Sequence, residues 1–124
     1  GTSANAMVEL IDLYPTLTEL CGFTNNVPQI LQGQSLVPML ENPELRDDEK
    51  LAYTVSYGGK DGAITTSLWK YTRWGEEAGM ENEELYDRIN DPQEFQNLVN
   101  DPQHKNILDE MRVKYDQIKQ KVNN

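Results

Sequence analysis

Few residues of this 124-residue chain have a type and spacing that could support catalysis. A nucleophile needs a base beside it, and a metal ion needs several ligands at suitable spacing. The one cysteine, Cys21, follows Leu20 in an apolar stretch, and we expect a small core side chain there. The one histidine, His104, lies among polar neighbours, and we expect it at the surface. We therefore predict no catalytic residue, no metal ligand and no cofactor-binding residue in this chain.

Two other patterns resemble sites only superficially. Asp47, Asp48 and Glu49 stand together, but no calcium-loop spacing follows them, and charge runs are typical of solvated linkers. Gly33-Gln34-Ser35 has the start of a nucleophile elbow, which needs Gly-x-Ser-x-Gly, and position 37 is valine. Neither pattern predicts a catalytic site.

Two stretches remain that could face a substrate, the loop at residues 57–61 and the aromatic-rich segment 69–74. A sugar ring can stack on an exposed aromatic side chain, although a core or sheet-face position is the alternative for each tryptophan. We take Tyr57, Lys60 and Trp74 as the candidate substrate-cleft residues.

The composition limits the partners. The chain is 37% hydrophobic and has a net charge of -10, so it can bury one modest core, and a phosphate backbone or an anionic membrane surface would repel it. The basic residues Lys114, Lys119 and Lys121 gather near the C-terminus, where they complement the negative end of a helix dipole. No apolar run approaches the roughly 20 residues of a membrane-spanning helix.

Alternating polar and apolar side chains predict four short strands, at residues 51–57, 63–66, 69–74 and 84–87. In the third strand Trp69, Tyr71 and Arg73 face one way. The segments between the strands are short and rich in glycine or charge, so hairpins can join them. This spacing favours an antiparallel meander.

The sequence Asn-Asp-Pro-Gln occurs twice, at residues 90–93 and 100–103. The first copy predicts a short helix with Asp91 as its cap and Glu94 completing a capping box, and with Phe95, Leu98 and Val99 on one side. The second predicts a helix from Pro102 to about Val122 that lies across one sheet face. An apolar stripe marks that helix, with Leu108 beside it, and consists of Ile107, Met111, Tyr115, Ile118 and Val122.

The N-terminal part has a different pattern. Residues 8–11 could form a short strand, followed by a helix with Asp12 near its start and Gly22 as its left-handed stop. A connector with several prolines follows over residues 23–46, and Ser35 is expected to cap a one-turn helix within it.

Several of these segments together resemble one family, the type I sulfatases. The strand Glu84 to Asp87 followed by Asp91, Pro92, Glu94, Asn97 and Leu98 is similar to their C-terminal signature. Residues 8–22 look like the strand and helix that close the large domain of these enzymes, and residues 32–40 resemble the family's Gly-x-Ser-Leu-x-Pro-Leu segment. Residues 64–74 look closest to iduronate-2-sulfatase and its bacterial relatives, except that threonine stands at position 65, where the family often has arginine.

The resemblance implies an α+β fold, the C-terminal subdomain of an alkaline-phosphatase-like sulfatase. About four antiparallel strands would pack against a C-terminal helix, and an N-terminal helix would be left over from the large α/β domain. Residues 1–45 would hold the last strand and helix of that domain with the connector, and residues 46–124 the small subdomain.

It also implies that the complete protein hydrolyses sulfate esters of sulfated carbohydrate, of the uronate 2-sulfate type, with a formylglycine and calcium. Cys21 lacks the Pro and Arg of the formylglycine motif, so it is not that nucleophile. The fragment alone would be non-catalytic, and its partner would be the large catalytic domain. A periplasmic or secreted location is implied only by the family.

Two alternatives stay open from the residues. One is an independent acidic interaction module that self-associates through its N-terminal helix or a sheet edge. The other is a phosphoesterase or phosphonate hydrolase of the same superfamily, because this subdomain does not contact the reacting group.

Overall fold

The computed structural model describes residues 3–4, 6–23, 28, 30–45, 50–56, 58–79 and 81–122. The chain forms two compact units, Gly1–Lys50 and Leu51–Asn124. Among the residues described, no helix is both long and apolar enough to cross a bilayer.

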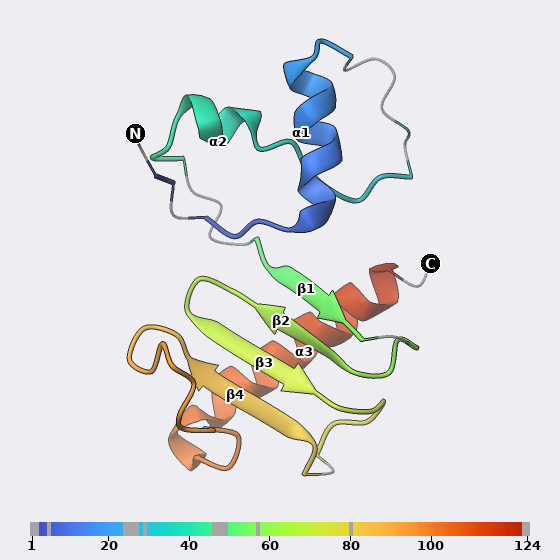
Figure 1. Ribbon diagram of the computed structural model, residues 1–124. Helices are drawn as coiled ribbons and strands as arrows, with labels where there is room; N and C mark the ends of the chain where they lie inside the picture. The colour runs from blue at the N-terminus through green and yellow to red at the C-terminus, as the bar shows by residue number, and fades with distance from the viewer. Residues whose placement is uncertain are drawn as a thin grey trace. The chain divides into compact units, whose positions relative to one another are not determined.

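The second unit contains a four-stranded sheet in which every neighbouring pair is antiparallel. The strands lie in sequence order, so the predicted meander is confirmed (Figure 1). Hairpins alone suffice for this topology because each strand pairs with the next one along the chain. The strands are β1 Ala52–Val55, β2 Gly62–Thr65, β3 Trp69–Arg73 and β4 Glu83–Asp87.

One long helix covers one face of this sheet (Figure 1). A short 3-10 turn, η3 Pro102–His104, leads into α3 Lys105–Val122. Asp101 caps the turn as predicted, because its carboxylate accepts from the amide of Gln103 at 2.9 Å. The predicted apolar stripe faces the sheet, and the core consists of Ile64, Tyr71, Leu85, Leu98, Leu108, Met111 and Tyr115.

Tyr115 lies at the centre of this core and is fully buried. Its ring meets those of Tyr53 and Tyr71 edge-on, with centroids 5.9 and 5.6 Å away, a favourable arrangement for aromatic quadrupoles. The guanidinium of Arg73 lies 4.2 Å from the same centroid and pairs with Asp116 of α3. Trp69, Tyr71 and Arg73 therefore share the helix-facing side of β3, as the alternation predicted.

The predicted helix after Asp91 does not form, and the segment instead covers the outer edge of β4. The amide of Leu98 donates to the carbonyl of Leu85 at 2.8 Å, and the side chain of Asn97 accepts from the amide of Leu85 at 3.0 Å. These bonds pair backbone groups of Leu85 at the edge of the sheet, which would otherwise lack a neighbouring strand. They are incompatible with helical hydrogen bonding within the segment. Glu94 has φ +58 and pairs with Lys70 at 2.6 Å, so it completes no capping box.

The first unit contains a 3-10 turn, η1 Leu10–Asp12, and two helices, α1 Leu13–Leu20 and α2 Val37–Glu41. The prediction of a strand at residues 8–11 is wrong, because hydrogen bonds to the Asp12 side chain stabilise a turn there. Its buried carboxylate accepts from the amide of Glu9 at 2.9 Å, the amide of Gln34 at 2.9 Å and the ammonium of Lys50 at 2.7 Å. Burial opposes ionisation, but these donors outweigh it and lower the pKa of Asp12.

The helix α1 buries Pro15 and Thr16 and leaves its apolar stripe exposed. The hydroxyl of Thr16 accepts from the amide of Leu36 at 2.9 Å, which fixes this side of the helix against the connector. Gly22 ends the segment with φ +75, as predicted. Cys21 is exposed, so the expectation of a core cysteine is wrong. The exposed stripe contains Leu13, Leu17 and Leu20.

The close approach of α3 to β2 gives a first testable prediction. A Cβ on Gly62 would lie 2.8 Å from the Tyr115 hydroxyl and 3.0 Å from the Thr54 carbonyl oxygen. We expect Gly62→Ala to lower the free energy of unfolding by about 1–3 kcal/mol, measured by urea denaturation, because overpacking forces neighbours apart. Adding Tyr115→Phe removes one of the two clashing atoms and should recover part of that loss. Equal losses in both backgrounds would contradict this contact.

Candidate functional site

Two hairpin loops lie at the same end of the sheet. In an antiparallel meander the end of β1, the start of β2 and the end of β3 coincide, and Gly62 pairs with Arg73 and Arg73 with Glu83 at this end. Figure 1 shows both loops on the right of the sheet. The loop at residues 56–61 carries Lys60, and the loop at 74–82 carries Trp74.

The structure describes two of the three candidate cleft residues. Lys60 is exposed, and 44% of Trp74 is exposed. Tyr57 lies outside the described residues. Lys60 and Trp74 therefore lie in neighbouring loops with their side chains accessible.

Asp61 joins the two loops. One carboxylate oxygen accepts from the amide of Gly75 at 2.8 Å, and the other accepts from the hydroxyl of Ser56 at 3.2 Å. Because Asp61 follows Lys60 and Gly75 follows Trp74, this one side chain restrains both candidate residues. The loop pair is thus connected by specific hydrogen bonds.

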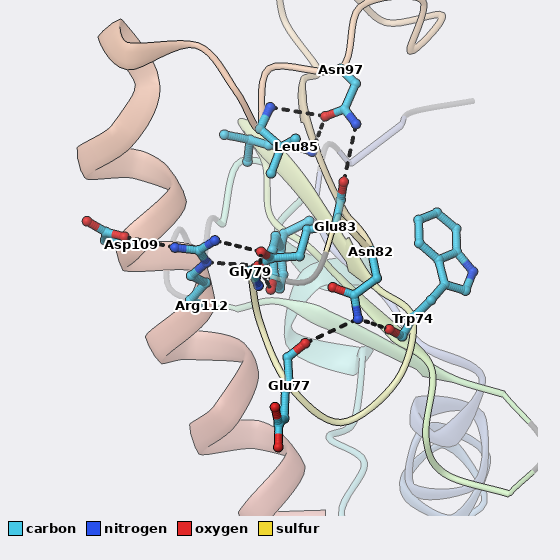
Figure 2. Close-up of polar contacts among 11 residues, drawn as sticks. Trp74, Glu77, Gly79, Asn82, Glu83, Leu85, Asn97, Asp109 and Arg112 are labelled. Carbon is cyan, nitrogen blue, oxygen red and sulfur yellow. Dashed lines mark hydrogen bonds and ion pairs between the residues drawn. The ribbon is translucent and has the colours of Figure 1, made fainter.

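Asn82 closes the longer loop on itself. Its side-chain amide donates to the backbone carbonyls of Trp74 and Glu77, the latter at 3.1 Å (Figure 2). Its backbone carbonyl accepts from the amide of Trp74 at 2.9 Å. Gly75 and Gly79 have φ +89 and +86, values that L side chains rarely adopt. The described part of the loop, residues 74–79 and 81–82, therefore has a conformation that depends on these two glycines.

Glu83 lies at the base of the loop and is nearly completely buried, with 3% of its side chain exposed. Arg112 of α3 donates to both carboxylate oxygens, at 2.8 and 2.6 Å. The Tyr71 hydroxyl donates at 2.5 Å and the Gly79 amide at 2.6 Å. Figure 2 shows Arg112 pointing from the helix toward Glu83 and Gly79. One carboxylate thus connects strand, helix and loop.

The electrostatics of this cluster are those of a permanent ion pair. Burial opposes ionisation of Glu83, but hydrogen bonds from Arg112, Tyr71 and Gly79 prevail and lower its pKa to about 2. Burial and the adjacent carboxylate raise the pKa of Tyr71. Near neutral pH Glu83 is therefore an anion and Tyr71 a neutral donor, which suits a structural bond.

The second tryptophan has a packing role. Trp69 contacts His104 edge-on, with ring centroids 5.6 Å apart, and the His104 Nδ1 lies 2.9 Å from the Asp101 carboxylate. The expected surface position of His104 is thus only partly correct, because the η3 turn places its ring on Trp69. Within the described residues no group of three or more His, Cys, Asp or Glu side chains is placed to hold a metal ion.

Sequence reasoning missed Asp61, Glu83 and Arg112. A signal existed for Glu83, since it lies two positions before the core residue Leu85 and so faces the core, where a carboxylate needs a charged partner. The sequence did not indicate which basic residue pairs with Glu83, because Arg112 is 29 residues away along the chain. Asp61 gave no signal beyond its place in a glycine-rich turn.

The comparison with known proteins assigns the family. The model of the C-terminal region of N-sulphoglucosamine sulphohydrolase matches residues 1–121. The chain belongs to this family. It is a C-terminal sulfatase domain, and its four-stranded sheet with α3 is the fold of that subdomain.

The relatives are sulfatases of greater length. Arylsulfatase K of Xenopus laevis is 29% identical over 110 residues, which are 80% of this chain and 20% of that protein. A solved 2-O GAG (glycosaminoglycan) sulfatase is 31% identical with a TM-score of 0.73, over 91% of this chain and 25% of that one. A protein solved with its substrate D-glucosamine-2-N,6-O-disulfate is 25% identical with a TM-score of 0.74, over 90% and 24%. This chain therefore spans a fifth to a quarter of these relatives.

The fold also occurs outside the sulfatases. The phosphonate monoester hydrolase of Agrobacterium radiobacter is 23% identical with a TM-score of 0.65, over 90% of this chain and 24% of that one. This likeness shows a shared fold alone.

The buried carboxylate gives a second testable prediction. The pKa of Glu83 is about 2 in the folded chain and ordinarily 4.5, so its stabilisation is complete above about pH 5 and is lost as the pH falls toward 2. We expect Glu83→Gln to lower the free energy of unfolding at pH 7 by about 3 kcal/mol, because Arg112 loses its anion. Between pH 5 and 2 the variant should lose less stability than the wild type.

Urea denaturation at stepped pH measures both effects. Glu84→Gln removes one carboxylate from the adjacent position on the other face of the sheet and is the matched control. Asp12 also has a lowered pKa, so part of the acid slope should persist in every variant. A Glu83→Gln slope equal to that of the wild type would contradict the assignment.

Proposed function

We propose that this chain is the C-terminal subdomain of a longer sulfatase that hydrolyses sulfate esters of carbohydrate, and that it borders the substrate cleft without supplying catalytic groups. The match to the sulfatase C-terminal family over nearly the whole chain carries this proposal. The relatives are four to five times longer, which leaves room in such a protein for a separate catalytic domain.

The substrate we propose is a glycosaminoglycan-type sulfated sugar with a 2-sulfated uronate, as in the iduronate-2-sulfatase-like group. Support comes from the 31% identity to a 2-O GAG sulfatase, against 25% for the protein solved with a glucosamine disulfate. The printed descriptions of both proteins name sulfated carbohydrate, which supports a sulfated sugar as the substrate class.

Lys60 and Trp74 are the residues with suitable chemistry. The Lys60 ammonium is an exposed positive charge on a chain of net charge -10, so it can attract a sulfate or uronate carboxylate that the rest of the surface repels. Trp74 offers a half-exposed indole on which a sugar ring can stack. The Asp61 bridge keeps the two loops adjacent, so one disaccharide could contact both. Tyr57 stays a third candidate from the sequence.

The chemistry of sulfate ester cleavage would come from elsewhere in the longer protein. We propose that it carries a formylglycine nucleophile and a calcium ion, which together supply attack on sulfur and charge stabilisation. We further propose that the catalytic domain covers the exposed apolar stripe of α1, since Leu13, Leu17 and Leu20 are each more than half exposed. The alternative occupant of that stripe is a second copy of this chain.

A phosphonate monoester hydrolase of the same fold is the second candidate function, favoured only by the structural likeness described above. The described residues of this subdomain include no group that distinguishes sulfur from phosphorus chemistry.

The decisive experiment assays a longer protein that contains this sequence in parallel with this chain alone. With calcium present, we expect the longer protein to hydrolyse an aryl sulfate and to desulfate a 2-sulfated uronate disaccharide, and the chain alone to do neither. Hydrolysis of a phenyl phosphonate ester in place of the sulfates would favour the second candidate. Activity of the isolated chain would overturn the non-catalytic role.

Substitutions in the longer protein test the two loop residues. We expect Lys60→Ala and Trp74→Ala each to raise KM for the disaccharide by about tenfold with little change in kcat, because they remove binding that is equal in ground and transition states. KM for the small aryl sulfate should change less. Lys105→Ala and Phe95→Ala, which alter an exposed lysine and an exposed aromatic elsewhere, are the matched controls. Unchanged KM in both loop variants would exclude this loop pair from the cleft.

A further inference from the structure

The loop at residues 74–82 is anchored to the helix α3 through a single carboxylate oxygen. Oε2 of Glu83 accepts from the amide of Gly79 at 2.6 Å and from Nη2 of Arg112 at 2.6 Å. Gly79 lies in the body of the loop, and Glu83 begins β4 directly after it. The helix therefore reaches the loop through one intermediate side chain, as Figure 2 shows.

The conformation of this loop needs such an anchor. Gly75, Gly79 and Glu81 all have positive φ, and Glu81 at +59 is a non-glycine residue in a sparsely populated region. Conformations of this kind persist only when surrounding bonds over-determine them. Asn82 and Glu83 supply those bonds from the residues that follow, while Asp61 supplies one from the neighbouring loop.

The anchor depends on the guanidinium in particular. Nε and Nη2 of Arg112 each meet a different oxygen of Glu83, so the planar fork fixes the carboxylate plane as well as its charge. The Tyr71 hydroxyl holds Oε1 alone, and its bond does not constrain where Oε2 points. Without Arg112 the carboxylate can rotate about its bond to Cγ and release the Gly79 amide.

We propose that Arg112 is a positioning residue that acts through Glu83 to fix the loop at residues 74–82, and with it Trp74, beside the loop that carries Lys60. This inference rests on the proposed function, since only a substrate-facing Trp74 gives the positioning a purpose. Arg112 lies in α3, outside the two loops, and would nevertheless affect how tightly a sugar binds to them.

Loss of the anchor leaves Glu83 buried without its cation and so lowers the stability of the whole unit, but the loop should loosen most. Arg112 is 29% exposed, so its removal opens no large cavity in the core. The bond from Gly75 to Asp61 remains, and so do the hydrogen bonds of Asn82. The largest effect is therefore expected at Gly79, with a smaller one at Trp74 at the other end of the loop.

The test uses this chain with Trp69→Phe, which leaves Trp74 as its only tryptophan. In Arg112→Ala we expect amide hydrogen exchange of Gly79 to accelerate at least about tenfold relative to that of Leu85, whose amide Asn97 holds. Acrylamide quenching of Trp74 should increase by about twofold as the loop opens. Arg112→Lys keeps the charge but not the fork, so we expect an intermediate result.

Asp109→Ala is the matched control, because it removes the other ion pair of Arg112, at 3.3 Å, on the same helix. It should leave Gly79 exchange and Trp74 quenching unchanged. Equal acceleration at Gly79 and Leu85 in Arg112→Ala would mean that Arg112 stabilises the unit as a whole, and the proposal would fail.

The same variants in the longer protein separate the positioning from the proposed function. If positioning matters to the substrate, Arg112→Ala should raise KM for the disaccharide in the same direction as Trp74→Ala and leave kcat nearly unchanged. A loosened loop with unchanged KM would confirm the coupling of α3 to the loop and contradict the substrate-facing role of Trp74.

Discussion

The ion pair between Glu83 and Arg112 is the interaction on which the second unit depends. A carboxylate with 3% of its side chain exposed is tolerable only if its charge is matched and its oxygens are satisfied. Here four donors meet it, from the helix, from β3 and from the loop. One turn further along α3, Asp116 pairs with Arg73 of the sheet in the opposite polarity. In one pair the helix supplies the cation, and in the other it supplies the anion. The two pairs together favour one orientation of the helix on the sheet, which apolar packing alone would specify less strictly.

The first unit uses the same device on a smaller scale. Asp12 is almost completely buried and connects the start of the unit, the connector near Gln34 and the last residue, Lys50. Its apolar side chains contribute little, because the stripe on α1 is exposed rather than packed. Polar contacts therefore determine the local structure of the first unit. Its exposed apolar stripe on α1 is a surface that a neighbouring domain could bury.

The division of roles proposed for the longer protein follows from this organisation. A sheet with a covering helix and a protected edge provides a rigid support, and its two loops at one end provide accessible side chains. Asn97 is central to the edge, since its side chain imitates a strand by bonding the backbone of Leu85 and Glu83. In the proposed division of roles the catalytic groups come from the rest of the longer protein, and the matching family is a C-terminal region.

The sequence by itself determined the elements whose signals are local. The alternation of Trp69, Tyr71 and Arg73 specified a strand, the spacing from Ile107 to Val122 specified a helix, and the motif after Glu84 specified the family. These patterns suffice because they involve neighbours on one strand or one helix face.

Only the tertiary structure decided the rest. The Asn-Asp-Pro-Gln motif begins a helix at its second copy but not at its first, because Asn97 and Leu98 bond the edge of β4 instead. Asp61 meets Gly75, and Glu83 meets Arg112, across 14 and 29 residues of chain. Cys21 is exposed because Pro15 and Thr16 occupy the buried side of α1. For Asn97, Asp61 and Glu83, partners that are distant along the chain outweigh a local preference, and their proximity exists only once the chain has folded.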